Sequence, residues 1–211
     1  MFENLKGIRS GLHLWVLIIY FFLSCAVPMG IHSSKPFKLL LNFDDLDRSG
    51  RWMVVNDGVM GGVSSSNLNL HSEGHLVFKG EVSMEYGGGF ASVRTDYENW
   101  EIGNFKGFIL KVRGDGKTYQ FRCRLGNSFD GVAYRHYFQA NDENWKEILL
   151  PFNEFVPTYR GKILKDSAPM DPESIRHLGL MISDKQSGNF RLEIAWIGAV
   201  SYTHLTLPTK A

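Results

Sequence analysis

One segment decides the fold class, FKGFILKVRGDGKTYQFRCRLG, which runs from Phe105 to Gly126. Two runs of alternating apolar and polar residues flank Gly114-Asp115-Gly116, which suits a tight reversal because glycine tolerates positive φ. The second run divides its side chains between two faces, with Tyr119, Phe121, Cys123 and Leu125 on one and Gln120, Arg122 and Arg124 on the other. We therefore expect a β-hairpin with one face in the core and the other exposed to water or used for binding.

Similar short runs occur along the rest of the chain, separated by turn residues. They cover residues 37–43, 51–57, 74–83, 89–96, 132–140, 145–152, 177–183 and 190–200. Asp171 and Pro172 are typical of a helical turn just before one of these runs. About nine short strands with no alternation of strand and helix predict an all-β fold, an antiparallel two-sheet sandwich.

The charge balance bears on the class of partner. The chain has 23 basic and 22 acidic residues, a formal net charge of +1. No long basic run is present, and a nucleic-acid-binding protein normally needs such a concentration of positive charge. We predict no nucleic-acid partner, and a single domain over residues 37–200.

The N-terminal segment has the layout of a targeting signal. Lys6 and Arg9 precede an apolar run over residues 12–26 that ends in small residues. We predict that residues 1–26 form a signal peptide or N-terminal membrane anchor, so that the protein is exported (periplasm, envelope or secreted) or membrane-anchored. Lipidation at Cys25 is an alternative, and translation from Met29 would make the protein intracellular.

The C-terminal segment, SYTHLTLPTKA (residues 201–211), follows the last predicted strand without a periodic pattern of its own. Its first nine residues match an in-frame translation of a sequencing-library transposon adaptor. We therefore interpret residues 201–211 as an adaptor-derived, non-native tail.

Catalytic and metal-binding motifs are not evident. No Gly-x-Ser-x-Gly elbow is present, and Cys123 belongs to the apolar face of a predicted strand. His71 and His75 flank a predicted hairpin turn, where their spacing of four does not bring two imidazoles together as it would on a helix. We predict surface histidines, no metal site, no cofactor and no enzymatic activity.

The glycine-containing stretch NDGVMGGVSSS, Asn56 to Ser66, is the main candidate for a binding site. No lysine follows Gly61-Gly62, as a phosphate-binding loop would require, so we interpret the stretch as an ordered loop between strands. An exposed methionine beside polar residues suits an adaptable protein-binding surface. The predicted binding residues are Trp52, Asn56, Asp57, Met60, Gly61, Gly62, Ser64 and Arg94.

Several motifs together resemble the family named for complex I intermediate-associated protein 30. They are RWMVVNDGVMGGVSSS (51–66), GGFASVR (88–94), GDGKTYQFR (114–122), WKEILLPF (145–152), PTYRG (157–161) and LGLMISDKQSGNFRLEI (178–194). They occur in the family's order, and the resemblance covers residues 37–200.

The resemblance implies a galactose-binding-like jelly roll and a non-catalytic, chaperone-like role in the assembly of respiratory complex I. The implied partner is another protein or a membrane protein complex. An alternative is an exported carbohydrate-binding jelly roll, which would need exposed aromatic rings to stack on a glycan. The residues to inspect for that role are Trp100, Tyr134, Tyr137 and Trp145.

Overall fold

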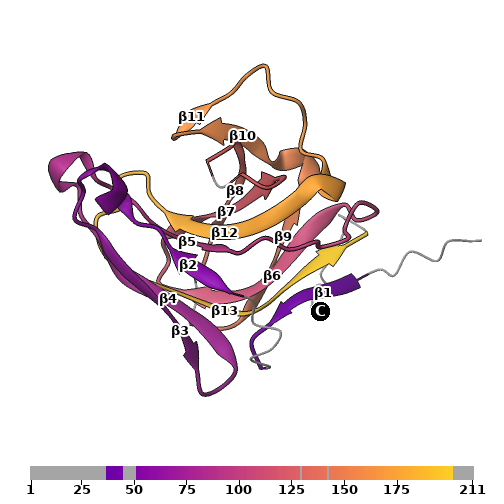
Figure 1. Ribbon diagram of the computed structural model, residues 1–211. Coiled ribbons are helices and arrows are strands. Elements are labelled where there is room, and N and C mark those ends of the chain that lie inside the picture. The colour runs from indigo at the N-terminus through magenta and orange to yellow at the C-terminus, as the bar shows by residue number, and fades with distance from the viewer. Residues whose placement is uncertain (1–36, 45–50, 129, 142, 202–211) are drawn as a thin grey trace, which may run out of the picture. The chain divides into compact units, whose positions relative to one another are not determined.

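The computed structural model describes residues 37–44, 51–128, 130–141 and 143–201. These residues form β-strands joined by turns and short 3₁₀ helices, arranged in two antiparallel sheets (Figure 1). The prediction of an all-β, antiparallel two-sheet jelly-roll sandwich is confirmed. The predicted targeting segment with Cys25, and the predicted adaptor-derived tail beyond residue 201, lie outside the described residues.

Sheet A is organised around its longest strand. Its members are β1 (Phe37–Asn42), β3 (Ser65–His71), β4 (His75–Val82), β6 (Gly107–Gly114), β9 (Lys146–Pro151) and β13 (Gly188–Val200). The order is β3-β4-β13-β6-β9, with β1 also paired to β13. Strand β13 pairs with β6 on one side, and with β4 and then β1 on the other. It therefore joins three segments that are far apart in the sequence.

Sheet B has seven strands in the order β11-β10-β8-β7-β12-β5-β2. They are β2 (Trp52–Val54), β5 (Ala91–Thr95), β7 (Thr118–Leu125), β8 (Ala133–Gln139), β10 (Val156–Tyr159), β11 (Lys162–Ile163) and β12 (Ile175–Ile182). The 3₁₀ helices are η2 (Asp57–Met60), η3 (Glu85–Gly87), η4 (Phe152–Glu154) and η5 (Pro172–Ser174). In η5, Asp171 accepts a hydrogen bond from the Glu173 amide, which confirms the predicted helical turn.

The core fills the space between the sheets and is rich in aromatic rings. Phe108 of sheet A packs edge-on against Phe121 of sheet B and against Phe152, each at 4.9 Å between ring centroids. Full burial of such a ring contributes about 2–3 kcal/mol to folding. Cys123 is fully buried in this core, where burial raises the pKa of its thiol. Its predicted place on the apolar face is confirmed.

The predicted hairpin in the deciding segment is wrong. Strands β6 and β7 are not paired, because β6 belongs to sheet A and β7 to sheet B. The three residues between them, with Gly116 at φ 84°, carry the chain from one sheet to the other. Asp115 fixes this corner, since its carboxylate accepts hydrogen bonds from the Tyr119 hydroxyl at 2.9 Å and the Arg191 amide at 2.8 Å.

Strand boundaries also differ from the prediction. The predicted strand over residues 51–57 is shortened to β2, and β3, β10 and β11 were not predicted. Strand β3 contains Asn67 and Asn69, which are poor strand formers, and its pairing with β4 is what holds it. Pro157 lowers the strand signal of β10, although proline is tolerated near a sheet edge.

Candidate functional site

A buried carboxylate ties two loops together at one end of the sandwich. We call residues 56–64, which include η2, and residues 83–90, which include η3, the paired loops. Asp57 is fully buried and accepts hydrogen bonds from the Ser64 amide (2.9 Å) and hydroxyl, and from the amides of Gly89 (2.6 Å) and Phe90 (3.2 Å). One side chain in the first loop thereby fixes the backbone of the second.

Three glycines of these loops are required by backbone geometry or by close contact with Asp57. Gly61 ends η2 with φ 93°, a conformation that other residues rarely adopt. A Cβ at Gly62 would lie 2.4 Å from Asp57 Cγ, and one at Gly88 would lie 2.5 Å from Asp57 Oδ2. The predicted need for positive φ and close backbone approach therefore agrees with the geometry.

The environment of Asp57 keeps it ionised. Burial alone would raise the pKa of this carboxyl group, but hydrogen bonds from the Ser64 hydroxyl and from the amides of Gly89, Phe90 and Ser64 outweigh burial and lower it. The donors are neutral, so the site carries one negative charge surrounded by oriented dipoles. Such an arrangement holds a loop in one conformation.

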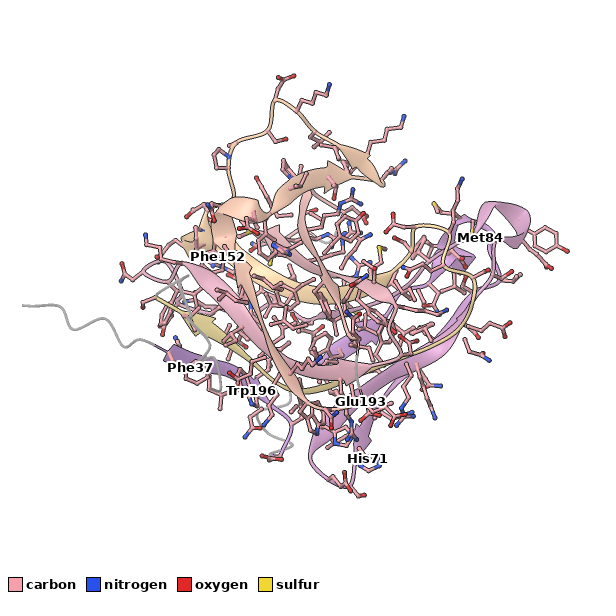
Figure 2. All side chains as sticks on the ribbon, turned by 180° about the vertical axis from the view of Figure 1, so that it is seen from behind. Phe37, His71, Met84, Phe152, Glu193 and Trp196 are labelled. Atoms are coloured by element: carbon pink, nitrogen blue, oxygen red, sulfur yellow. The ribbon has the colours of Figure 1, made fainter. Side chains whose placement is uncertain are left out.

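The paired loops expose an unusual amount of apolar surface. Val59 is 73%, Met60 63% and Tyr86 76% exposed, and Val63 and Met84 are also exposed. Figure 2 shows Met84 at the edge of the molecule, on one of these projecting segments. Tyr86 has φ 53°, a left-handed backbone conformation that costs free energy for a residue other than glycine. We call these five side chains the apolar tip.

The predicted binding residues divide into groups. Asp57 and Ser64 are buried, so the prediction that they form part of a surface patch needs correction: they position the loop from inside. Asn56 accepts a hydrogen bond from the Ser66 hydroxyl, and the half-buried Trp52 packs 6.5 Å from the Phe43 ring.

Two of the predicted binding residues differ from this inner set. Met60 is exposed as predicted. Arg94 lies in β5, paired with Met53 and Gly179, on the outer face of sheet B and not in the paired loops. The rest of the tip was not predicted, although Val59 and Tyr86 are apolar residues next to glycines in the sequence, a pattern typical of an exposed turn.

The aromatic residues considered for glycan binding are not gathered in one place. Trp100 and Tyr134 are buried in the core. Tyr137 lies on β8 of sheet B, while Trp145 contacts His75 and Arg113 of sheet A, at 5.3 Å and 4.6 Å. A stacking platform needs exposed rings along one surface, and these four do not form one.

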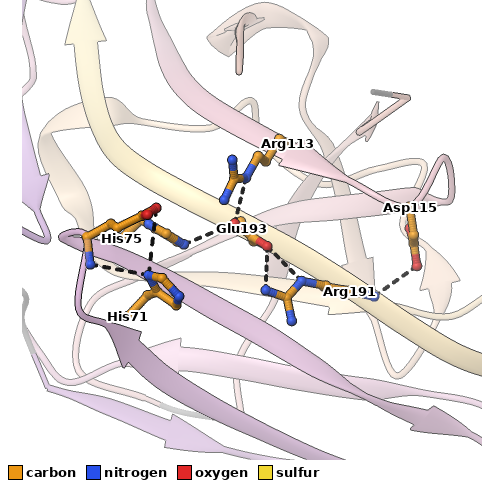
Figure 3. A network of polar contacts seen from close by, with 7 residues as sticks. His71, His75, Arg113, Asp115, Arg191 and Glu193 are labelled. Carbon is orange, nitrogen blue, oxygen red and sulfur yellow. Dashed lines mark hydrogen bonds and ion pairs between the residues drawn. The ribbon is translucent and has the colours of Figure 1, made fainter. Parts of the chain in front are cut away.

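A second polar network lies on the outer face of sheet A, centred on Glu193 (Figure 3). Glu193 is 5% exposed and accepts hydrogen bonds from Arg113 Nε and Arg191 Nε, each at 2.6 Å. Burial would raise its pKa, but the two arginines outweigh burial and lower it. The buried carboxylate therefore stays ionised and paired.

Histidines extend this network. His75 Nε2 lies 3.0 Å from Glu193 Oε2, yet the pKa of His75 is lowered, because burial outweighs the attraction of Glu193. His75 is buried and directly opposite His71 in the β3–β4 hairpin, with the two rings stacked 4.4 Å apart. The prediction that these imidazoles do not come together is wrong, because the pairing of β3 with β4 places the two rings side by side, as a spacing of four would on a helix.

The two histidines and Glu73 have the composition of a divalent metal site. One ligand atom from each residue lies within 4.8 Å of the others. Two imidazoles and a carboxylate form a set that zinc accepts. These are the described residues best placed to hold a metal ion.

Comparison with known proteins places this geometry in context. A protein of Mus musculus named "Complex I intermediate-associated protein 30, mitochondrial" is 26% identical over 175 residues, which cover 74% of this chain and 52% of the relative. A Caenorhabditis elegans relative, named "Probable complex I intermediate-associated protein 30, mitochondrial", is 27% identical over 183 residues. These residues cover 76% of this chain and 53% of the relative. This chain spans about half the length of these curated relatives.

Among solved structures, a family 11 carbohydrate-binding module of a cellulosomal cellulase from Clostridium thermocellum is similar. Its TM-score is 0.62 at 16% identity, over 81% of this chain and 97% of the module. At this identity the likeness establishes the jelly-roll fold alone.

The predicted location, exported or membrane-anchored, is wrong. The Mus musculus and Drosophila melanogaster relatives are both named as mitochondrial proteins. Across the described residues, none of the helices has the length and apolar character needed to cross a bilayer.

The family assignment rests on the sequence profile as well as on the individual relatives. The profile of the complex I intermediate-associated protein 30 family matches residues 41–194, which include the paired loops, sheet B, most of sheet A and the Glu193 network. The motifs noted in the sequence lie within or overlap that match. The chain belongs to the complex I intermediate-associated protein 30 family.

Proposed function

We propose that this domain is a non-catalytic, chaperone-like protein-binding module that assists the assembly of respiratory complex I. The names of the relatives support the assembly role, and the match covers about half of their length. The main observation in support of protein binding is the apolar tip, where Val59, Met60 and Tyr86 are each more than half exposed. Exposed apolar patches on a soluble domain commonly mark interaction sites.

The construction of the tip suits reversible binding to different apolar surfaces. Methionine side chains adapt to the shape of a partner, and a tyrosine contributes a large rigid ring with a polar end. The backbone beneath them is fixed by Asp57, so little loop entropy is lost when a partner docks. An assembly intermediate with unburied apolar surface is the expected partner.

The test is crosslinked capture from mitochondria of the source cells, followed by mass spectrometry of membrane and soluble fractions. The bait proteins are the wild type, a Met60→Glu, Tyr86→Ser double variant, and Ile163→Glu as the matched control. Ile163 is 56% exposed on β11, at the opposite edge of sheet B from β2.

We expect complex I subunits with the wild type and the control, and about fivefold lower recovery with the double variant. Circular dichroism of all three proteins checks that they are folded. Equal recovery with the double variant would remove the tip as the binding surface, and absence of complex I subunits from every capture would refute the assembly role.

A further inference from the structure

A row of arginines crosses the outer face of sheet B. The strand register places Arg94 of β5 and Arg122 of β7 on either side of Gly179 in β12, and pairs Arg122 with Arg135 of β8. Arg124 lies two residues along β7 and therefore points to the same face. We call these four side chains the arginine row.

The arginine row faces away from the core. Arg122 and Arg124 alternate along β7 with Phe121 and Cys123, which are fully buried between the sheets. Adjacent arginines on paired strands have Cβ atoms roughly 5 Å apart, a distance at which like charges destabilise a sheet. A surface shaped by stability alone would separate these charges.

Part of the polar surface of three of these arginines has no partner among the described residues. The Nε atoms of Arg122, Arg124 and Arg135 are buried and donate no hydrogen bond to any described residue. Arg122 Nη1 reaches the Gln120 amide oxygen at 3.4 Å and the Met181 sulfur at 2.8 Å, both of which are neutral acceptors. Among the described residues, no carboxylate forms an ion pair with Arg122 as Glu193 does with Arg113.

The electrostatic environment agrees with this geometry. Burial and then the charges of Arg124, Arg135 and Arg94 lower the pKa of Arg122 to about 10. Asp130 opposes the shifts at Arg94 and Arg124 only in part. The group remains charged at neutral pH, so the row concentrates positive charge in a partly desolvated place.

Gly179 leaves the centre of the row without a side chain. It is buried in the middle of β12 and has a φ that any residue could adopt, so turn geometry does not require it. A Cβ there would meet the Val93 carbonyl oxygen at 2.9 Å. Glycine inside a strand often marks the close approach of a ligand or another backbone, and here it leaves a bare backbone floor between Arg94 and Arg122.

Packing explains part of the arrangement. The Arg135 guanidinium stacks 4.8 Å from the Tyr137 ring, and arginine stems cover apolar surface well. Packing of the stems does not require the charged ends to converge, and cross-strand pairing of Arg122 with Arg135 is the arrangement that repulsion disfavours. The convergence therefore calls for an anion.

We propose that the arginine row binds a phosphate-bearing ligand, a phosphate monoester or diphosphate group seated over Gly179. Guanidinium groups pair with phosphate oxygens through two parallel hydrogen bonds, which would satisfy the Nε atoms of Arg122 and Arg135. A single carboxylate brings one negative charge, whereas a phosphate brings about two and a diphosphate more. The larger charge matches the combined charge of Arg122, Arg124 and Arg135, which Asp130 opposes only at Arg124.

The test is isothermal titration with inorganic pyrophosphate at constant ionic strength, together with sedimentation of vesicles of phosphatidylcholine with and without phosphatidic acid. The full chain is compared with an Arg122→Gln, Arg135→Gln double variant. Arg51→Gln is the control, because Arg51 is highly exposed and its removal subtracts a charge outside the row. Arg122→Lys keeps the charge but removes the fork of donors.

We expect wild type and Arg51→Gln to bind equally, the double variant to bind at least about tenfold more weakly, and Arg122→Lys to fall between them. Binding of pyrophosphate indicates a soluble ligand, and binding only to phosphatidic acid vesicles indicates a lipid headgroup. If neither binds, or if the double variant binds as the wild type does, the proposal is overturned. A thermal melt of the unliganded double variant at or above the wild-type temperature checks that loss of binding is not loss of fold.

Discussion

The outer faces of both sheets carry arginines on neighbouring strands, but the two sets of arginines differ in whether a carboxylate of the protein pairs with them. On sheet A, Arg113 and Arg191 converge on Glu193, so their charges are compensated within the protein. On sheet B, Arg122 and Arg135 converge on one another across paired strands. On the first face a carboxylate of the protein pairs with both arginines, whereas on the second face no described carboxylate forms an ion pair with Arg122 or Arg135. Compensated charge fixes the fold, and uncompensated charge is available for recognition.

The paired loops offer a third case, in which a carboxylate is surrounded by neutral donors. Asp57→Ala is expected to destabilise the domain most, by roughly 3 kcal/mol, since it removes four hydrogen bonds and leaves buried amides without an acceptor. Urea unfolding monitored by tryptophan fluorescence measures the change. Ser66→Ala, which loses one partly buried hydrogen bond to Asn56, is the control with a smaller effect. A loss under 1 kcal/mol at Asp57 would contradict its anchoring role.

Breaking the compensated face comes next in size. Glu193→Gln is expected to cost about 2 kcal/mol, because Arg113 and Arg191 lose a buried counter-charge but are exposed enough to recover some hydration. The same unfolding experiment measures it. If the variant is as stable as the wild type, the network contributes no net stability, and the contrast between the two faces fails.

The pH dependence of stability separates His75 from the carboxylates. The pKa of His75 is lowered in the folded state, so the unfolded chain binds a proton more readily. Stability is therefore fully present above the ordinary pKa of 6.5, and is lost as pH falls through 6.5 toward the folded pKa. We expect melting temperatures to decrease between pH 7.5 and 5.5, with a flatter profile in His75→Gln. Identical profiles would show that His75 does not titrate with folding.

The smallest effect is the most direct test of the comparison. Arg122→Gln and Arg191→Gln are the same substitution on the two faces. Without ligand, Arg122→Gln is expected to raise stability by about 0.5 kcal/mol by relieving repulsion, while Arg191→Gln lowers it by a similar amount. Denaturant midpoints measured side by side give both signs. Two changes of the same sign would mean that the faces do not differ.

The sequence predicted the sandwich because alternation of apolar residues reports which side of a strand is buried. It could not distinguish a hairpin from a corner at Asp115, since both need glycine at the reversal and differ only in which distant strands pair. The arginine row could not be predicted for the same reason, because the sequence does not show which distant strands pair. Arg122 and Arg124 were predicted to share a face, but their convergence with Arg94 and Arg135 depends on the register of three other strands.

At Asp57 the local conformation was evident from the sequence, but the burial of the side chain was not. Its turn chemistry and the glycines beside it were evident locally, whereas its burial arises from amides of Gly89 and Phe90, more than thirty residues away in sequence. Composition alone suggested a surface acid, because isolated acidic residues are seldom fully buried. Contacts across that distance are what converted it into an internal anchor.

Strand β13 has a consequence for the order in which the protein is made. Because β1, β4 and β6 all pair with β13, sheet A lacks its central strand until residues 188–200 have been synthesised. During translation β1, β4 and β6 have unpaired backbone groups along the edges that later pair with β13. Contacts between segments so far apart in the sequence also form slowly. On a ribosome stalled before residue 188, the nascent chain would therefore lack a completed sheet A. At that stage this domain, which we propose is itself chaperone-like, would need protection by general chaperones.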